Sequence, residues 1–199
     1  MEVEKKVVYL QENKLISLDM NIVPLFPPYL YSVQYGDGDS LDEYHRLFSL
    51  WHDIDYVQGY FEKHSPEMNV DFWGELVDPE LATDRTFDEA YDLEDYIEEL
   101  NQNTAHGMVP DFDEFFEPLD GEFGYIFLQT PMKAYGTQNP SLLRLYAIKL
   151  KPNCYLITGG GIKYCRKMDE SPELKAEIEK LKMVRSFLQK LGIEDEEDF

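Results

Sequence analysis

The chain has 199 residues, of which 43% are hydrophobic and 14% aromatic, and this is enough for one packed domain. No apolar run reaches the roughly 18 residues that span a bilayer, and the first ten residues, MEVEKKVVYL, lack the apolar stretch of a signal peptide. We therefore expect a cytoplasmic protein with no membrane partner. The formal net charge of −22 argues against general nucleic-acid binding, because phosphate contacts need a positive surface.

The negative charge is concentrated in the middle of the chain. Residues 36–122 hold 26 acidic and three basic residues, whereas residues 123–199 hold 10 acidic and 12 basic residues. A local basic groove therefore remains possible in the last part of the chain. The two cysteines, Cys154 and Cys165, are too few for a disulfide framework, so we expect both to be reduced thiols.

The N-terminal part predicts strands followed by a helix. Residues 7–35 are rich in β-branched and aromatic residues and include proline-bound extended segments. Ser40 followed by Glu43 predicts a capping box, which opens a helix that should end near His64, before Pro66.

A second helix is expected within TFDEAYDLEDYIEELN (residues 86–101). Thr86 followed by Glu89 predicts its capping box, and its outer face is almost entirely Asp and Glu. We interpret residues 36–122 as an acidic helical insertion.

The last part of the chain predicts further strands and a covering helix. Strands are expected around FGYIFLQT (123–130), LLRLYAIKL (142–150) and CYLITGGGIK (154–163), with KPN as a hairpin turn. Ser171 predicts the N-cap of the final helix, because Pro172 suits the first helical position. An apolar stripe on this helix should pack on the sheet: Leu174, Ile178, Leu181, Val184, Leu188 and Leu191.

Three consecutive glycines, Gly159–Gly161, precede Lys163. They do not fit a P-loop, because no Ser or Thr follows the lysine, and they do not match the G-x-G-x-x-G dinucleotide fingerprint. They indicate either a β-bulge or the close approach of another backbone. The alternative is a backbone that leaves room for a ligand phosphate beside Lys163 and Arg166.

The histidines do not predict a metal site. His45 and His52 lie seven residues apart on the first predicted helix, and only His52 with Asp55 has the spacing of metal ligands. We therefore expect no metal and no cofactor. Arg46 with His52 also resembles the short arginine–histidine pattern of HEPN ribonucleases.

The order of elements after residue 122 resembles a known family. A strand bearing Arg144, a strand ending in GGGIK, a basic turn and the helix SPELKAEIEKLKMVRSFLQ follow one another. This order resembles the C-terminal half of RelE/HigB-type toxins, including their phage-derived branch, over residues 123–191. The whole chain also looks like a set of acidic bacterial proteins with a W-[HN]-D helix near the front and an ITGG-x-IK strand near the end.

The resemblance to RelE/HigB-type toxins implies a metal-independent ribonuclease. In such an enzyme the RNA 2′-hydroxyl attacks the adjacent phosphorus, and cations stabilise the charge that develops. Arg144, Lys163 and Arg166 would surround the scissile phosphate, and Tyr164 or Lys133 would assist proton transfer. The implied partners are RNA or the ribosome, and an antitoxin. Substrate binding would fall to Lys133, Lys167, Gly160 and Gly161.

We predict a single α+β domain over residues 1–199, with an antiparallel sheet, the acidic helical insertion and a C-terminal helix packed on the sheet. Two functions remain open. One is a RelE/HigB-like toxin that cleaves RNA. The other is a non-enzymatic acidic binding protein, such as an immunity or inhibitor protein, that presents carboxylates to a basic partner. The sequence leaves the oligomeric state open.

Overall fold

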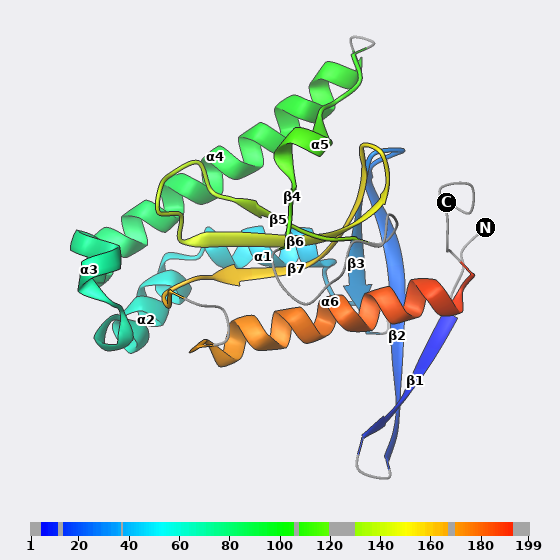
Figure 1. Cartoon of the computed structure of the whole chain (residues 1–199), viewed down its shortest axis with the longest axis horizontal. Helices are drawn as coiled ribbons and strands as arrows, with labels where there is room; N and C mark the ends of the chain where they lie inside the picture. Colours follow the sequence, from blue (N-terminus) through cyan, green and yellow to red (C-terminus); the bar gives the residue numbers. More distant parts are fainter. Residues whose placement is uncertain are drawn as a thin grey trace.

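The computed structural model describes residues 5–11, 14–36, 38–105, 108–119, 130–166 and 170–192. Within these ranges, a seven-stranded sheet has the order β1-β2-β3-β7-β6-β5-β4 (Figure 1). The strands are β1 Lys5–Gln11, β2 Lys14–Phe26, β3 Leu30–Tyr35, β4 Glu117–Pro118, β5 Thr130–Tyr135, β6 Leu143–Lys151 and β7 Cys154–Ile162.

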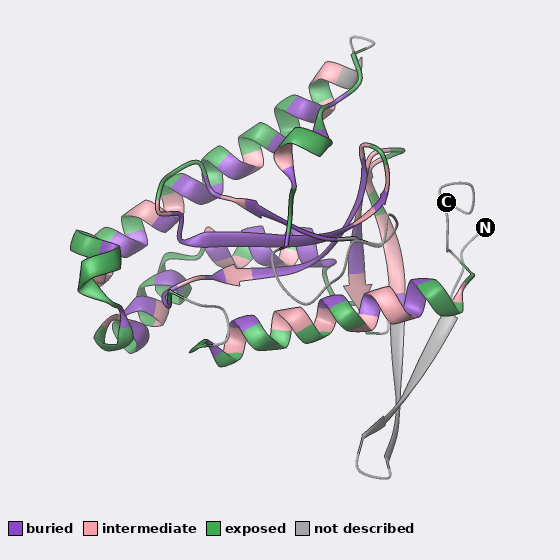
Figure 2. Ribbon diagram, viewed as in Figure 1, coloured by how far each residue is buried: buried purple, intermediate pink, exposed green. Residues whose placement is uncertain are grey.

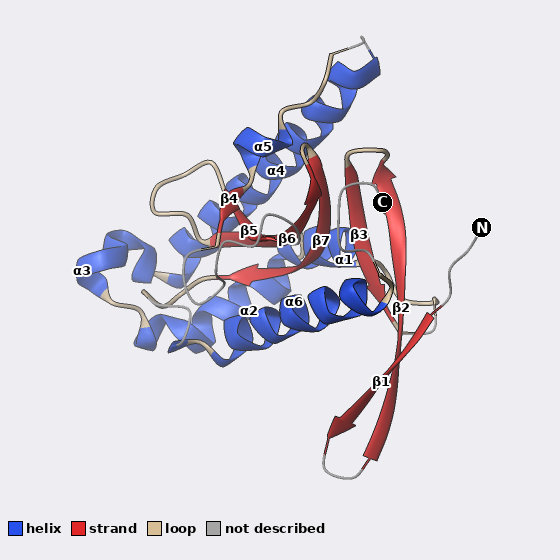
Figure 3. Cartoon of the chain, turned by 45° about the vertical axis from the view of Figure 1, so that its right-hand side comes forward, coloured by secondary structure: helices blue, strands red, loops and turns tan. Residues whose placement is uncertain are grey.

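The sheet is antiparallel except at one pair of strands. Strands β3 and β7 run parallel, with Leu30–Ser32 opposite Tyr155–Ile157. All other neighbours in the described sheet pair antiparallel. A parallel pair needs a crossover connection, and the helices between β3 and β7 lie within that connection. Strand β1 and the adjoining part of β2 form a ribbon that extends beyond the helices (Figure 3).

Helices cover both faces of the sheet. Helix α6 (Pro172–Lys190) lies on one face, whereas α1 (Glu43–Trp51) and α4 (Pro79–Ala105) lie on the other (Figure 1). Buried residues concentrate on β6 and β7 and on the sheet-facing sides of these helices (Figure 2). The predicted α+β class and the C-terminal helix on the sheet are confirmed. The remaining helical segments are α2 (Ile54–His64), η1 (Ser65–Glu67), α3 (Val70–Trp73), η2 (Gly74–Val77) and α5 (Phe112–Phe115).

The predicted start and continuity of the first helix were wrong. Asp42, not Ser40, caps α1, because its carboxylate accepts hydrogen bonds from the main-chain N–H groups of the first turn. The Ser40 hydroxyl instead donates to the carbonyl of Tyr35. The helix also breaks at His52, and Asp53 caps α2 in the same way as Asp42 caps α1. Two aspartates at successive caps therefore divide one predicted helix into two.

The second predicted helix begins earlier than expected. Helix α4 starts at Pro79, and the Asp78 carboxylate accepts hydrogen bonds from two N–H groups of the first turn. Thr86 is therefore not a cap. Its hydroxyl donates to the Ala82 carbonyl inside the helix, at 2.8 Å. Glu89, the other half of the expected capping box, is fully buried.

The C-terminal predictions are confirmed where the structure describes them. The β6–β7 hairpin turns at residues 152–153, with Asn153 at a φ of 57°. The Ser171 hydroxyl caps α6 by accepting from the N–H of Leu174 at 3.1 Å. Leu181 and Leu188 of the predicted stripe are fully buried. The strand expected over residues 123–129 lies outside the described residues, and the described part of that prediction begins with β5 at Thr130.

None of the described helices is long and apolar enough to cross a membrane.

Candidate functional site

Three of the predicted cations gather on one face of the sheet. Arg144 of β6 lies opposite Tyr135 of β5 in the strand register. Its guanidinium carbon is 4.2 Å from the centroid of the Tyr135 ring, and the Lys133 ammonium is 5.3 Å from the same centroid. Burial lowers the pKa of Lys163, and the charges of Arg144 and Lys133 lower it further. The structure therefore brings Arg144, Lys133 and Lys163 together.

Arg144 is mostly withdrawn from solvent. Arg144 is only 8% exposed, and burial lowers the pKa of its guanidinium. One terminal nitrogen donates hydrogen bonds to the carbonyls of Ser141, at 3.0 Å, and Leu143, at 2.5 Å. Much of its hydrogen-bonding capacity therefore holds the start of β6 in place.

The other predicted residues lie elsewhere. The exposed Arg166 places its guanidinium carbon 6.0 Å from the ring centroid of Phe72, and it lines a separate cavity with Glu67 and Tyr164. Tyr164 itself is buried and stacks on His64, with ring centroids 4.2 Å apart. Lys167 lies outside the described residues. Three cations were predicted to surround a phosphate. Arg144 and Lys163 lie near each other, whereas Arg166 lines a different cavity.

Of the three glycines, Gly160 closely approaches the backbone of the neighbouring strand, and all three lie beside a bulge. The β6–β7 register shifts between Tyr146 and Ala147, opposite Gly159 and Ile157. A Cβ on Gly160 would lie 2.5 Å from the Arg144 carbonyl oxygen and 2.9 Å from the Leu47 side chain.

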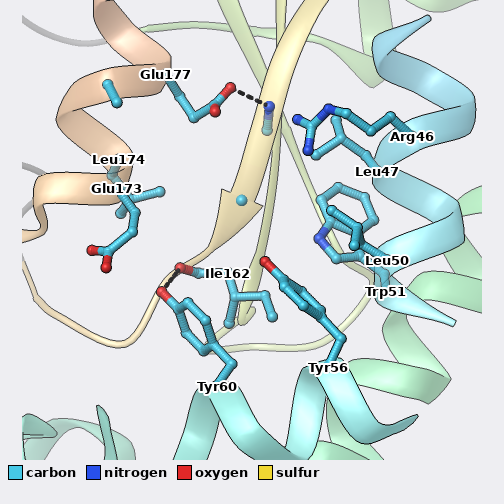
Figure 4. A pocket seen from close by; sticks show the side chains of 13 residues that line it. Arg46, Leu47, Leu50, Trp51, Tyr56, Tyr60, Ile162, Glu173, Leu174 and Glu177 are labelled. Carbon is cyan, nitrogen blue, oxygen red and sulfur yellow. Dashed lines mark hydrogen bonds between the residues drawn. The ribbon is translucent and has the colours of Figure 1, made fainter. Parts of the chain in front are cut away.

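Gly160 and Gly161 also line a cleft of about 280 Å³ (Figure 4). The floor is the last part of β7, up to Ile162. Helices α1 and α2 form one wall and α6 forms the other, so the cleft joins segments far apart in the sequence. The lining side chains include Arg46, Leu47, Leu50, Trp51, Tyr56, Tyr60, Glu173, Leu174 and Glu177.

Side chains satisfy several main-chain groups on the edge of β7 beside this cleft. The Tyr35 hydroxyl donates to the carbonyl of Thr158 at 2.8 Å. The N–H of Gly160 donates to the Glu177 carboxylate at 3.1 Å. The Tyr60 hydroxyl donates to the carbonyl of Ile162 at 2.9 Å.

An ion-pair network ties α1 to α6 next to the cleft. Arg46 donates two hydrogen bonds to Glu43, at 2.7 and 2.6 Å, and Glu43 is almost fully buried. The Lys180 ammonium lies 3.3 Å from Glu43 and 2.8 Å from Glu177. Because bidentate pairs involving buried carboxylates fix geometry, the network holds the walls of the cleft in place.

A second candidate surface is the outer face of α4. Its carboxylates project at spacings of three and four residues, which places them on one side of the helix. Large apolar side chains are exposed on the same helix: Tyr91 is 54% exposed, Leu81 45% and Tyr96 39%. We call this surface the acidic face; its exposed carboxylates are Glu80, Asp84, Asp88, Asp92, Asp95, Glu98 and Glu99.

Sequence reasoning missed the residues that build the cleft. Tyr56 and Tyr60 on α2, and Glu173 and Glu177 on α6, are each four residues apart and so share one side of their helix. That spacing could have predicted that each pair of side chains lies on one side of its helix. What the sequence could not supply was the meeting of the two helices over the end of β7.

Metal and thiol chemistry receive no support from the described residues. No group of three or more His, Cys, Asp or Glu side chains among them is arranged to hold a metal ion. Cys154 and Cys165 are buried free thiols, and burial raises the pKa of Cys154 to about 11. A thiol with so high a pKa is a poor nucleophile at neutral pH.

Comparison of the chain with models of protein families, with curated proteins and with solved structures finds no match.

Proposed function

We propose that the chain is a cytoplasmic, non-enzymatic binding protein whose acidic face on α4 binds a basic partner protein. The carboxylates of this face are exposed at regular helical spacing. The helix carries a single arginine, Arg85, and that residue is directed at the buried Glu89. A continuous negative surface of this kind attracts basic proteins and accelerates their association.

The exposure of Tyr91 among these carboxylates is the observation that carries the proposal. Tyr91 is 54% exposed, and its ring stacks on that of His52, the residue that follows α1, with ring centroids 4.3 Å apart. Stacking holds the ring in a fixed position on the surface. Tyrosines are enriched in protein interfaces because they bring a large contact area and a polar hydroxyl. A fixed aromatic ring within a field of carboxylates therefore suits a protein partner better than a free cation.

Site-specific photo-crosslinking in cells tests the proposed surface. A photoreactive phenylalanine analogue at Tyr91 should form a crosslink to one discrete protein of basic pI. The same analogue at Glu179, an exposed position on α6, should not. Equal crosslinking from both positions, or from neither, would contradict the proposal.

Matched charge variants then measure the electrostatic contribution. The triple variant Asp84→Asn, Asp88→Asn and Asp95→Asn should lower the yield of the Tyr91 crosslink, and added salt should lower the wild-type yield too. The control Asp71→Asn, Glu75→Gln and Glu114→Gln removes the same charge from exposed positions outside α4. Equal losses in both triple variants would show that net charge, not this face, matters.

RNA cleavage of the RelE/HigB type is a second candidate, favoured by one observation. Lys133 and Arg144 lie over the Tyr135 ring, and their charges act on Lys163. The lowered pKa of Lys163 makes its amine more available as a general base. In this proposal the 2′-oxygen forms a bond to phosphorus as the bond to the 5′-oxygen breaks. Lys163 accepts the 2′-hydroxyl proton, water protonates the leaving 5′-oxygen, and Arg144 and Lys133 balance the developing charge.

Incubation of the purified protein with RNA, with and without ribosomes and with a metal chelator, tests this candidate. Lys163→Gln should abolish cleavage, and Lys175→Gln, an exposed lysine on α6, should not. Arg144 is a poor test residue, because its guanidinium bonds to main-chain carbonyls. Intact RNA in every wild-type reaction would exclude the toxin function.

A further inference from the structure

Strand β7 loses its neighbour β3 halfway along its length. The parallel pairing ends where Ser32 lies opposite Ile157. At that point the Ser32 hydroxyl oxygen accepts a hydrogen bond of 3.0 Å from the N–H of Tyr44, in the first turn of α1. The helix therefore begins where the ladder ends, and the last residues of β7 form an edge that faces the cleft.

The directions of the main-chain groups on this edge follow from the hydrogen bonds. The N–H of Gly160 donates to Glu177 and the carbonyl of Ile162 accepts from Tyr60, so both residues direct their main-chain groups into the cleft. In a strand, the N–H and the carbonyl of one residue point to the same side. The carbonyl of Gly160 and the N–H of Ile162 therefore also face the cleft. Neither of these two groups has a hydrogen-bond partner among the described residues.

These two remaining groups fit two kinds of strand pairing, and in only one of them does a single bound residue make both hydrogen bonds. A residue in parallel alignment opposite Gly161 donates its N–H to the carbonyl of Gly160 and accepts from the N–H of Ile162. An antiparallel segment opposite Gly161 would need two residues for the same bonds, one that donates to the carbonyl of Gly160 and one that accepts from the N–H of Ile162. The parallel alignment needs one residue in the cleft and keeps the direction in which β3 pairs with β7. We propose that the cleft binds one residue of an extended basic segment from a partner protein, parallel to β7 and opposite Gly161.

The walls of the cleft determine where the side chain of the bound residue points and which residue type fits. Residues directly opposite in a sheet share a face, and a Cβ on Gly161 would point at Leu174 of α6, 3.3 Å away. The bound side chain therefore points toward α6, where Glu173 and Glu177 line the cleft. The cation of the lining, Arg46, is already paired with Glu43. Glu177 is already bonded to Lys180 and to the N–H of Gly160. Glu173, whose ion pair with the exposed Lys63 is 3.6 Å long, therefore supplies the carboxylate that favours an arginine or a lysine.

The neighbouring residues of the segment meet an apolar wall. Their side chains alternate to the other face, on which Leu47 and Trp51 of α1 approach Gly160. Tyr56 extends this wall from α2 (Figure 4). The volume of about 280 Å³ is just below the range of about 300–1,000 Å³ typical of ligand pockets. One basic residue with apolar neighbours therefore suits the cleft.

This site is separate from the acidic face of α4, and the two proposals can fail independently. A partner could bind α4 without entering the cleft, and a short peptide could enter the cleft without touching α4. The other role for Glu177 and Tyr60 is to block an exposed sheet edge against pairing with other chains. A direct binding experiment distinguishes recognition from blocking.

Titration of the ¹⁵N-labelled protein with the peptide acetyl-Thr-Leu-Arg-Leu-Thr-amide tests the proposal by NMR. The amide resonance of Ile162 should shift downfield and saturate, because its N–H gains a hydrogen bond. Glutamate in place of the central arginine should weaken binding at least tenfold. N-methylation of the arginine nitrogen should do the same, because it removes the donor to Gly160. N-methylation of the following leucine, whose N–H points away from β7, should weaken binding less.

Variants of the protein complete the experiment. Glu173→Gln removes a partly exposed carboxylate and should lower the affinity for the arginine peptide about fivefold. Glu179→Gln makes the same change on an exposed part of α6 outside the cleft and should leave the affinity unchanged. An Ile162 resonance that does not move at millimolar peptide overturns the proposal. Equal affinity for the arginine and glutamate peptides, or for the N-methylated arginine peptide, also overturns it.

Discussion

The Glu89 carboxylate of α4 accepts a hydrogen bond of 2.8 Å from the Ser141 hydroxyl, at the start of β6. The main-chain N–H groups of Leu142 and Leu143 donate to the same carboxylate, at 3.0 and 3.2 Å. Glu89 is fully buried. A single side chain therefore attaches the acidic helix to the strand that carries Arg144. It accepts from three buried donors, of which the N–H of Leu143 also donates to the Ser141 hydroxyl and that hydroxyl to the carbonyl of Leu143, at 3.2 and 3.1 Å.

Replacing Glu89 with alanine should destabilise the protein by about 3 kcal/mol, because the buried N–H of Leu142 loses its acceptor and two further buried donors lose one of theirs. Urea denaturation measures this loss. Glu89→Gln, which keeps one acceptor oxygen, should cost less than the alanine variant. Equal losses in the two variants would show that packing, not hydrogen bonding, sets the role of this residue.

The glutamine variant should also change the pH dependence of stability. Burial raises the pKa of Glu89, although its hydrogen bonds act in the opposite direction. The folded-state pKa therefore exceeds the unfolded value, so the stabilising contribution is complete below the unfolded pKa and is lost as the pH rises through the folded pKa. The difference in unfolding free energy between wild type and Glu89→Gln should shift in favour of the variant over this range. A difference that is constant with pH would contradict the raised pKa.

Leu181→Ala should cost about 2–5 kcal/mol, because this fully buried leucine of α6 leaves a cavity above the sheet. Gln189→Ala, at an exposed position of the same helix, is the control and should cost little. The midpoint of chemical denaturation reports both. An unchanged midpoint for Leu181→Ala would mean that α6 does not pack as described.

Gly160→Ala should destabilise the protein by about 1–3 kcal/mol, because the added methyl group overlaps the Arg144 carbonyl and the Leu47 side chain. Gly59→Ala is the matched control. Gly59 lies within α2, and a Cβ there meets nothing within 4 Å, so the change should stabilise the protein slightly through helix propensity. A neutral Gly160→Ala would show that the backbone around β7 can move apart.

The sequence predicts the β6–β7 hairpin and α6 because their signals are local. Asn153 tolerates the positive φ of the turn, and Ser171 with Pro172 forms a complete helix start. The caps of the earlier helices were mispredicted. At α1 the pattern names two acceptors within reach of one helix end, Ser40 and Asp42, and only the folded backbone selects between them. Thr86 lies eight residues after Asp78, so there the error is in the position of the helix start.

The candidate sites depend on contacts that local patterns do not encode. The spacing of Thr86 and Glu89 suggested a capping box, yet the carboxylate reaches a residue 52 positions away in the sequence. The cleft requires α2 and α6 to meet over the end of β7, and that meeting follows from the parallel β3–β7 pair. The cations were identified by charge alone, so the burial of Arg144 could not be foreseen.

Protonation of His64 should limit the stability of the protein in acid. The ring contacts those of Tyr60 and Tyr164, with centroids 4.5 and 4.2 Å away, and the two tyrosine rings are 6.0 Å from each other. Both ring nitrogens are buried and lack hydrogen-bond partners in the described part of the chain. Burial lowers the pKa of His64 and Lys63 adds to this, whereas Glu173, 3.6 Å away, and the more distant Glu67 oppose it.

Because its folded-state pKa is lowered, His64 contributes stability that is present above the unfolded pKa of about 6.5 and is lost as the pH falls through the folded value. His64→Phe keeps a ring against the two tyrosines and cannot be protonated. The unfolding free energy of the variant minus that of the wild type should therefore rise as the pH is lowered from 7 to 5. Urea denaturation at half-unit pH steps measures this difference, and the subtraction removes the shared titration of the carboxylates. If the unfolding free energies of the wild type and of His64→Phe change in parallel between pH 7 and 5, His64 accepts a proton in the folded protein as readily as in the unfolded chain.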